Sequence, residues 1–99
     1  MTAEARPLAI EIAYCTGCHF LPRATWIAQE LLHTYAEYTA ALALIPAHGG
    51  ILEIRVNGDL LFSTKDEDRF PEIRELKDGI NRYLAAEETA TLKQHPAGR

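Results

Sequence analysis

Residues 8–19 read LAIEIAYCTGCH and predict a β-strand that runs directly into a turn containing two cysteines. From Leu8 to Tyr14, larger apolar side chains alternate with alanine or glutamate, which is the period-two pattern of a half-buried strand. Cys15 and Cys18 follow and are the only 2 cysteines of the 99-residue chain. Two sulfurs at this spacing can exchange a disulfide with a partner or bind a soft metal ion.

The segment after the cysteines has the periodicity of an amphipathic helix. Pro22 suits the first helical turn, where its missing N–H is no loss. A helix that begins near Leu21 leaves both sulfurs ahead of it, so we expect a weak effect of the helix dipole on them. Trp26 falls on the polar side, where it either covers a sheet edge or presents an aromatic platform to a redox partner. The apolar stripe consists of Ala24, Ile27, Ala28, Leu31, Leu32 and Tyr35.

A second strand and a hairpin are expected next. Residues 38–45, which Pro46 closes, suit a strand parallel to the first, because a helix connects the two. Residues 51–56 and 59–64 flank Asn57-Gly58, a strong hairpin signal.

A two-residue hairpin loop would place Ile54 opposite Leu61, and Leu60 and Phe62 together on the other face. Either a bulge or longer loop turns one of the latter two residues inward, or the Leu60/Phe62 face is a partner or dimer surface.

Residues 65–69 are expected to form a charged loop, and Phe70-Pro71 to open a final amphipathic helix. Gly79 weakens this helix slightly, and the apolar stripe of the helix ends after Ala85. The predicted order is β-α-β-β-β-α: an α/β, thioredoxin-like fold with a four-stranded mixed sheet and two helices on one face. We expect a single domain over residues 1–99, with an ordered core of about residues 8–88 and flexible termini that include residues 95–99.

Composition limits the classes of function. With 47% hydrophobic and 24% charged residues, the chain is an ordinary globular domain. A net charge of -4 and scattered basic residues argue against a nucleic-acid partner. No apolar run approaches the ~18 residues of a membrane span, and the N-terminal residues lack an apolar export signal, so we expect a cytoplasmic protein without a membrane partner. Thiols in that compartment are mostly reduced.

The cysteine pair favours redox chemistry. C-x-x-C between a strand and a helix is a redox signal, and a bridge over so few residues closes almost no loop, which favours a chemical role over a structural one. One thiolate attacks a partner's disulfide, and the second cysteine resolves the mixed disulfide. The Arg23 side chain, if it folds back toward the cysteines, would lower the pKa of a cysteine thiol. Gly17 permits the tight turn between the two cysteines.

Four other interpretations remain open. Cys-x-x-Cys-His, completed by His19, is also the attachment signature of c-type haem, but that normally requires export, and Met1 is the only methionine. A ferredoxin-like metal carrier has the order β-α-β-β-α-β, which differs from the one predicted here. A structural zinc site needs two more ligands, and the pair could also be inert buried thiols. We therefore predict no metal and no cofactor. The remaining histidines, His33, His48 and His95, are isolated in the sequence.

Several motifs together resemble the selenoprotein W-like, or Rdx, family. They are residues 12–18, residues 50–58, and the pair of segments 61–63 and 69–72. The resemblance implies a thioredoxin-like fold and a thiol or selenol redox activity, often linked to glutathione. Animal members carry selenocysteine at the position of Cys18, which suggests Cys18 as the reactive sulfur and Cys15 as its resolving partner. Analogy with thioredoxin suggests the reverse order.

These observations lead to one main hypothesis and one alternative. The main hypothesis is a thiol-disulfide redox protein in which Cys15 and Cys18 cycle between dithiol and disulfide, with protein or glutathione thiols and disulfides as partners. The alternative is a non-enzymatic, redox-sensitive module whose cysteines switch its affinity for a protein. Turnover distinguishes the two.

Overall fold

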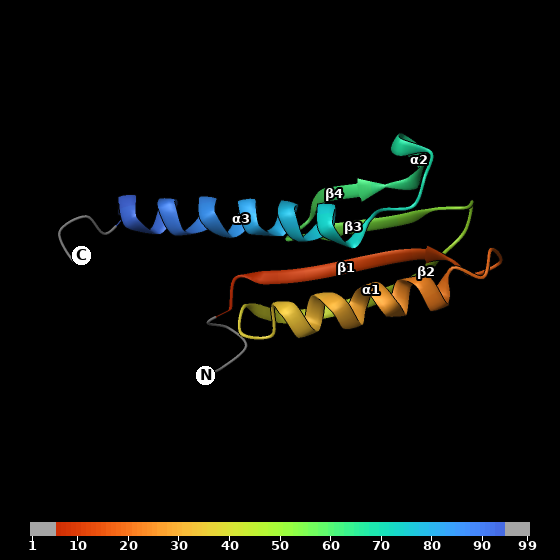
Figure 1. The fold of residues 1–99 in the computed structure, drawn as a ribbon, viewed down its shortest axis with the longest axis horizontal. Helices are drawn as coiled ribbons and strands as arrows, with labels where there is room; N and C mark the ends of the chain where they lie inside the picture. The colour runs from red at the N-terminus through yellow and green to blue at the C-terminus, as the bar shows by residue number, and fades with distance from the viewer. Residues whose placement is uncertain (1–5, 95–99) are drawn as a thin grey trace.

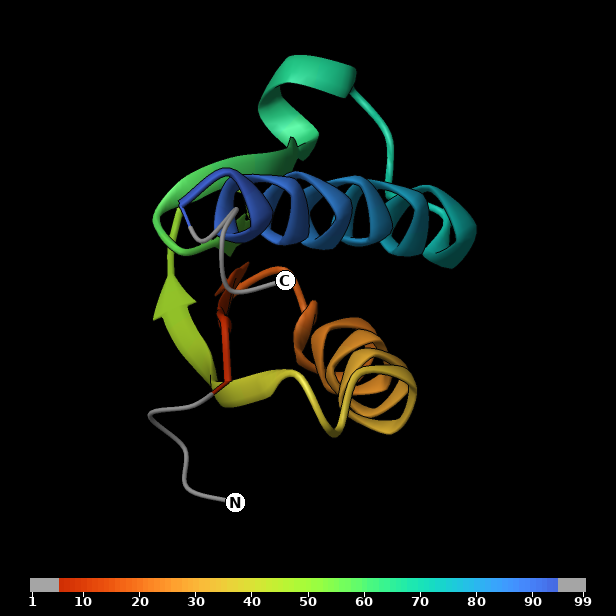
Figure 2. The same ribbon diagram turned by 90° about the vertical axis from the view of Figure 1, so that its left-hand side faces the viewer.

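The computed structural model describes residues 6–94, which form a four-stranded mixed sheet with two long helices on one face (Figures 1 and 2). The predicted β-α-β-β-β-α thioredoxin-like fold is confirmed. Of the flexible termini that we predicted outside about residues 8–88, residues 1–5 and 95–99 lie outside the described residues, and residues 89–94 belong to a helix. The strands are β1 (Leu8–Cys15), β2 (Thr39–Ala47), β3 (Leu52–Val56) and β4 (Asp59–Ser63), and the helices are α1 (Leu21–Thr34), α2 (Thr64–Glu67) and α3 (Ile73–Gln94).

Strand β1 lies between two neighbours in the sheet order β2-β1-β3-β4. It pairs in parallel with β2 and antiparallel with β3, where Ile12 is opposite Ile54. The predicted parallel pair is therefore confirmed. Strand β2 continues through Pro46 to Ala47 instead of ending at Ile45. A residue without an N–H is tolerated there because β2 is an edge strand.

The core lies between the sheet and both long helices. Each of its large aliphatic side chains contributes about 1.5–3 kcal/mol relative to an exposed position. The opposite face of the sheet carries small and charged side chains of β1, and no described helix covers it (Figure 2). The buried residues are Leu8, Ile10, Ile12, Leu52, Ile54, Val56 and Phe62 from the sheet, Ala24, Ile27, Ala28, Leu31 and Tyr35 from α1 and its end, and Leu76 and Ile80 from α3.

The hairpin turn fixes both β4 and the start of β1. Asn57 and Gly58 have φ angles of 53° and 88°, as a turn with two left-handed residues requires. The Asn57 amide also accepts a hydrogen bond from the Ala9 N–H (2.8 Å) and donates to the Pro7 carbonyl (2.7 Å) and to the Tyr83 hydroxyl (2.6 Å). This one side chain therefore connects the turn to β1 and to α3.

A bulge in β4 changes the register expected for the hairpin. Arg55 is opposite Leu60, and Ile54 is opposite Phe62, so Leu61 is the extra residue and the predicted Ile54–Leu61 pair is wrong. Phe62 is 6% exposed and belongs to the core, whereas Leu60 is 43% exposed. The two side chains do not share an exposed face, so the surface that we considered for a partner or dimer is absent. The bulge alternative is the correct one.

The charged segment expected as a loop contains a short helix. The Ser63 hydroxyl accepts a hydrogen bond from the Lys65 N–H (3.2 Å) and caps α2. The helix ends at Glu67, and Asp68 follows as its C-cap with a φ of 57°. Farther along, α3 starts at Ile73 and continues to Gln94, past the end of the predicted apolar stripe.

Helices α1 and α3 are joined by polar contacts beside the core. The Tyr35 hydroxyl oxygen lies 2.9 Å from the Lys77 carbonyl and 2.8 Å from Asn81 Oδ1, and Lys77 pairs with Glu30 at 3.5 Å. Burial, followed by the nearby Asp78 carboxylate, raises the pKa of Tyr35. The hydroxyl therefore keeps its proton and can donate it to α3.

Gly79 allows α3 to lie close to β4. A Cβ atom added at Gly79 would lie 2.5 Å from Leu61 Cδ1, well inside van der Waals contact. The bulge that makes Leu61 an extra residue directs its side chain against this glycine. Gly79 thus lowers the intrinsic helix propensity, as expected from the sequence, but the packing of α3 on β4 depends on it.

We predict that Gly79→Ala gains no stability in the natural chain, because the added methyl group displaces Leu61. In a Leu61→Ala background the same substitution should stabilise the protein by about 1 kcal/mol, which is the helix-propensity difference. Urea unfolding of the four proteins measures the coupling. Equal stabilisation in both backgrounds would show that the close approach does not matter.

Candidate redox site

The structure joins Cys15 and Cys18 in a disulfide, with their Cα atoms 5.4 Å apart. Cys15 ends β1 and is 4% exposed, whereas Cys18 lies in the following turn and is partly exposed. The Cys15 N–H donates to the Ile51 carbonyl (2.9 Å), and the Thr16 N–H donates to the Ala47 carbonyl (3.0 Å). The chain segments on both sides of β1 therefore fix the backbone at Cys15, whereas Cys18 lies in the turn and is only partly buried. The catalytic roles of the two cysteines stay predictions.

The tight turn depends on His19. Its φ is 60°, a left-handed conformation that histidine adopts more readily than most residues. Gly17, to which we attributed this freedom, is not in the left-handed region, and a Cβ atom there would meet nothing within 4 Å. Gly17 instead leaves open space beside the disulfide.

Helix α1 begins at Leu21, so it starts beyond both sulfurs, as predicted. Phe20 occupies the N-cap position, and no side chain caps the helix there. The first turn has no acidic residue. The helix dipole acts mainly within the first turn of a helix, and Cys18 lies just before the first turn of α1.

Phe70 packs beside the cysteine turn, a placement that the sequence analysis missed. Its ring meets that of Phe20 edge to face, with centroids 4.9 Å apart, and the Arg23 guanidinium carbon lies 4.3 Å from the Phe70 centroid. The Phe-Pro pair before α3 signalled only a helix start. The tertiary fold alone brings the segment before α3 next to the start of α1.

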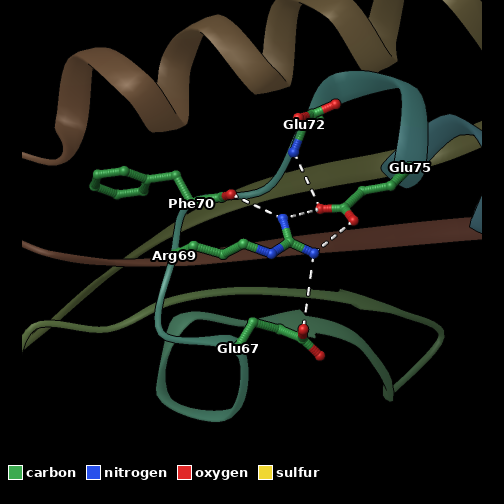
Figure 3. A network of polar contacts seen from close by, with 5 residues as sticks. All are labelled: Glu67, Arg69, Phe70, Glu72 and Glu75. Carbon is green, nitrogen blue, oxygen red and sulfur yellow. Dashed lines mark hydrogen bonds and ion pairs between the residues drawn. The ribbon is translucent and has the colours of Figure 1, made fainter.

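Arg69 holds the segment that carries Phe70 (Figure 3). Its guanidinium nitrogens make two hydrogen bonds of 2.8 Å to the Glu75 carboxylate, and one of them also donates to the Phe70 carbonyl (3.1 Å). The Glu75 carboxylate accepts a further bond from the Glu72 N–H (3.1 Å) and so caps α3. The hydrogen bonds with Arg69 lower the pKa of Glu75 and raise that of Arg69.

We predict that Glu75→Gln destabilises the protein at neutral pH, because Gln can still cap α3 but carries no charge for Arg69. The natural carboxylate has a lowered pKa in the folded state, so its stabilising effect is present above the unfolded pKa and is lost as pH falls through the folded pKa. Urea unfolding at pH 7 and pH 3 should show a gap between the two proteins that closes in acid. An equal gap at both values would contradict the ion-pair origin.

Two open hollows are lined in part by residues that follow the cysteine turn. The first, of about 360 Å³, is lined by Phe20, Gly50 and the region of α2, including Lys65. The second, of about 540 Å³, is lined by His19, Pro22, Arg23 and Trp26. Both contain a residue within two positions of Cys18.

Among residues 6–86, whose side chains the structure describes, no group of three or more histidine, cysteine or acidic side chains could hold a metal ion. His95 lies outside the described residues. None of the described helices is long and apolar enough to cross a membrane.

Residues 9–82 match the sequence profile of the Rdx family. The chain belongs to the Rdx family. A selenoprotein W-related protein from Vibrio cholerae has a similar structure, with a TM-score of 0.77 and 39% identity over 80% of this chain and 99% of that one. A structure from Bordetella parapertussis gives a TM-score of 0.75 and 40% identity over 79% and 99% of the respective chains. The comparison with curated proteins returned no match.

Family membership confirms the resemblance read from the sequence motifs, and the similar structures confirm the fold. An Rdx chain whose Cys15 and Cys18 stand at disulfide distance is suited to a redox function. The glutathione link, the partners and the cytoplasmic location stay predictions.

Proposed function

We propose that this Rdx protein is a cytoplasmic thiol-disulfide exchange protein that cycles Cys15 and Cys18 between dithiol and disulfide. The observation that carries the proposal is the disulfide itself, which joins a buried cysteine to a partly exposed one. Exchange needs an accessible sulfur that a partner can reach and a second sulfur within bonding distance of it. No bound cofactor is needed for this chemistry.

The difference in burial favours Cys18 as the attacking sulfur. A partner's disulfide must approach the nucleophile in line, and the 4% exposure of Cys15 leaves little room for such an approach. Cys18 is partly exposed in the turn, next in sequence to Gly17, which has open space around it. This order agrees with the one carried over from the selenocysteine position of animal relatives.

The proposed reaction has two steps. The Cys18 thiolate attacks one sulfur of the partner's disulfide, forming a mixed disulfide and releasing the partner's other sulfur as a thiolate, which takes up a proton. The Cys15 thiol loses its proton and attacks the Cys18 sulfur. This second step releases the partner's remaining thiol and forms the Cys15–Cys18 disulfide, so the partner is reduced and the protein oxidised.

We predict that Cys15→Ser, after incubation with glutathione disulfide, accumulates a mixed disulfide at Cys18 at least about tenfold faster than Cys18→Ser does at Cys15. Intact mass spectrometry over time measures both rates. The reverse preference would assign the attack to Cys15. Trapping in neither variant would disprove the exchange function, provided that circular dichroism shows both variants to be folded.

The glutathione link is part of the proposal, and the hollow at Lys65 supports it. Its volume of about 360 Å³ falls within the range of small-molecule sites. No described residue forms a hydrogen bond or ion pair with Lys65 Nζ, so this ammonium group is available to a carboxylate. Glutathione carries two carboxylates.

Lys65→Ala should slow exchange with glutathione disulfide by about fivefold, since a surface ion pair contributes up to about 1 kcal/mol. Exchange with the uncharged disulfide of 2-mercaptoethanol should not change. Stopped-flow measurements of both reactions, with Lys77→Ala as a control for lost charge, test this. Equal slowing of both disulfides would mean that Lys65 does not bind glutathione.

A second candidate function is a redox-sensitive interaction module. The disulfide closes the turn between β1 and α1, so its reduction would free Cys18 from the buried Cys15 and alter the surface beside it. Such a module would bind a protein in one redox state without turning over. Multiple turnovers of a disulfide substrate per protein molecule, in excess reductant, favour the exchange function over this one.

A further inference from the structure

Trp26 stands on the outer side of α1, away from the buried stripe, and is 47% exposed. Pro22 and Arg23 precede it by four and three residues, so all three are neighbours on the helix surface. With His19 they line the open groove of about 540 Å³, which thus starts at the residue directly after Cys18. The exposed Trp26 side chain therefore shares one groove with the residue that follows Cys18.

Arg23 is held in position, and its N–H donors have no partner among the described residues. Its guanidinium carbon lies 4.3 Å from the centroid of Phe70, and the network around Arg69 fixes the chain that carries this ring. Among the described residues, none forms a hydrogen bond or ion pair with the Arg23 guanidinium. The groove therefore presents a fixed cation whose N–H groups are free to bind a carboxylate.

Charge is unevenly distributed around the groove. The chain has 14 acidic residues and a net charge of -4, yet residues 12–29 contain no acidic residue and Arg23 as their only Lys or Arg. No carboxylate lines the groove. A partner segment that carries an acidic and a large apolar side chain would complement this surface in both respects.

We infer that the groove binds an extended segment of a protein redox partner, in which an acidic residue and a large apolar residue lie close to the reacting cysteine. The carboxylate pairs with Arg23, the apolar side chain covers Trp26, and the cysteine then lies at Cys18. The rise from Pro22 to Trp26, about 6 Å, corresponds to about two residues of extended peptide. The exchange step rests on the proposed function, but the binding does not.

The binding can be measured without any redox chemistry, because Trp26 is the only tryptophan of the chain. We would titrate the protein with a short capped peptide carrying serine in place of cysteine, one glutamate and one leucine. Saturable change in Trp26 emission is expected, with affinity about tenfold higher than for the same peptide with lysine in place of glutamate. No saturable change with the acidic peptide would overturn the inference.

Matched variants separate the groove from the rest of the surface. Arg23→Gln should abolish the preference for the acidic peptide, Arg23→Lys should retain part of it, and Arg74→Gln, on α3, should leave it unchanged. A preference that persists in Arg23→Gln would overturn the assignment of the carboxylate site. If the protein alone shows concentration-dependent emission and sedimentation, and peptide does not compete, the occupant is a second copy of this chain and the inference is wrong.

Kinetics then distinguish the inference from the proposed function. With the cysteine peptide as a mixed disulfide, Trp26→Ala should reduce the exchange rate about tenfold, while Leu32→Ala, which removes a similarly exposed apolar side chain (43%) from α1, should not. Neither substitution should affect the disulfide of 2-mercaptoethanol. If the protein exchanges with that small disulfide but Trp26→Ala does not slow exchange with the peptide, the groove inference is wrong and the proposed function stands. If the peptide binds but no exchange occurs with either disulfide, the proposed function is wrong and the groove inference stands.

Discussion

The pairing of β1 along both of its edges is the constraint on which the rest of the structure depends. One face of this strand is fully apolar, with Leu8, Ile10 and Ile12 at most 1% exposed. A slip by one residue would turn that face to solvent, so the register with β2 and β3 is fixed. The register in turn fixes where the strand ends, which places Cys15 at the edge of the core and Cys18 outside it.

The two sulfurs consequently have unlike surroundings although only two residues separate them. Backbone hydrogen bonds from Cys15 and Thr16 reach chain segments on either side of β1, so the first sulfur moves with the sheet. The second belongs to a turn whose left-handed residue, His19, is exposed. In the exchange that we propose, this arrangement suits Cys18 to attack and Cys15 to resolve, because the mixed disulfide would form where the second thiol already lies.

The surroundings of the turn come from the far end of the chain. Figure 1 shows the segment between α2 and α3 returning toward the sheet, and this segment carries Phe70, which meets Phe20 and Arg23 at the start of α1. The Arg69–Glu75 pair in Figure 3 joins the cap of α3 to the segment that holds Phe70. Stability of the α3 cap and geometry of the candidate site therefore share one network of contacts.

The sequence by itself determined the order of elements, the parallel β1–β2 pair, the hairpin at Asn57-Gly58 and the cysteine pair, because these follow from short-range periodicity and turn chemistry. It did not determine that Phe62 is buried, that Gly79 admits Leu61, or that Phe70 and Arg23 meet beside the disulfide. Those features depend on a bulge and on contacts between residues far apart in the chain, and the bulge also reverses which side chains face inward. The packing of α3 against the sheet and α1 determines these features, because it brings together side chains that are far apart in the sequence.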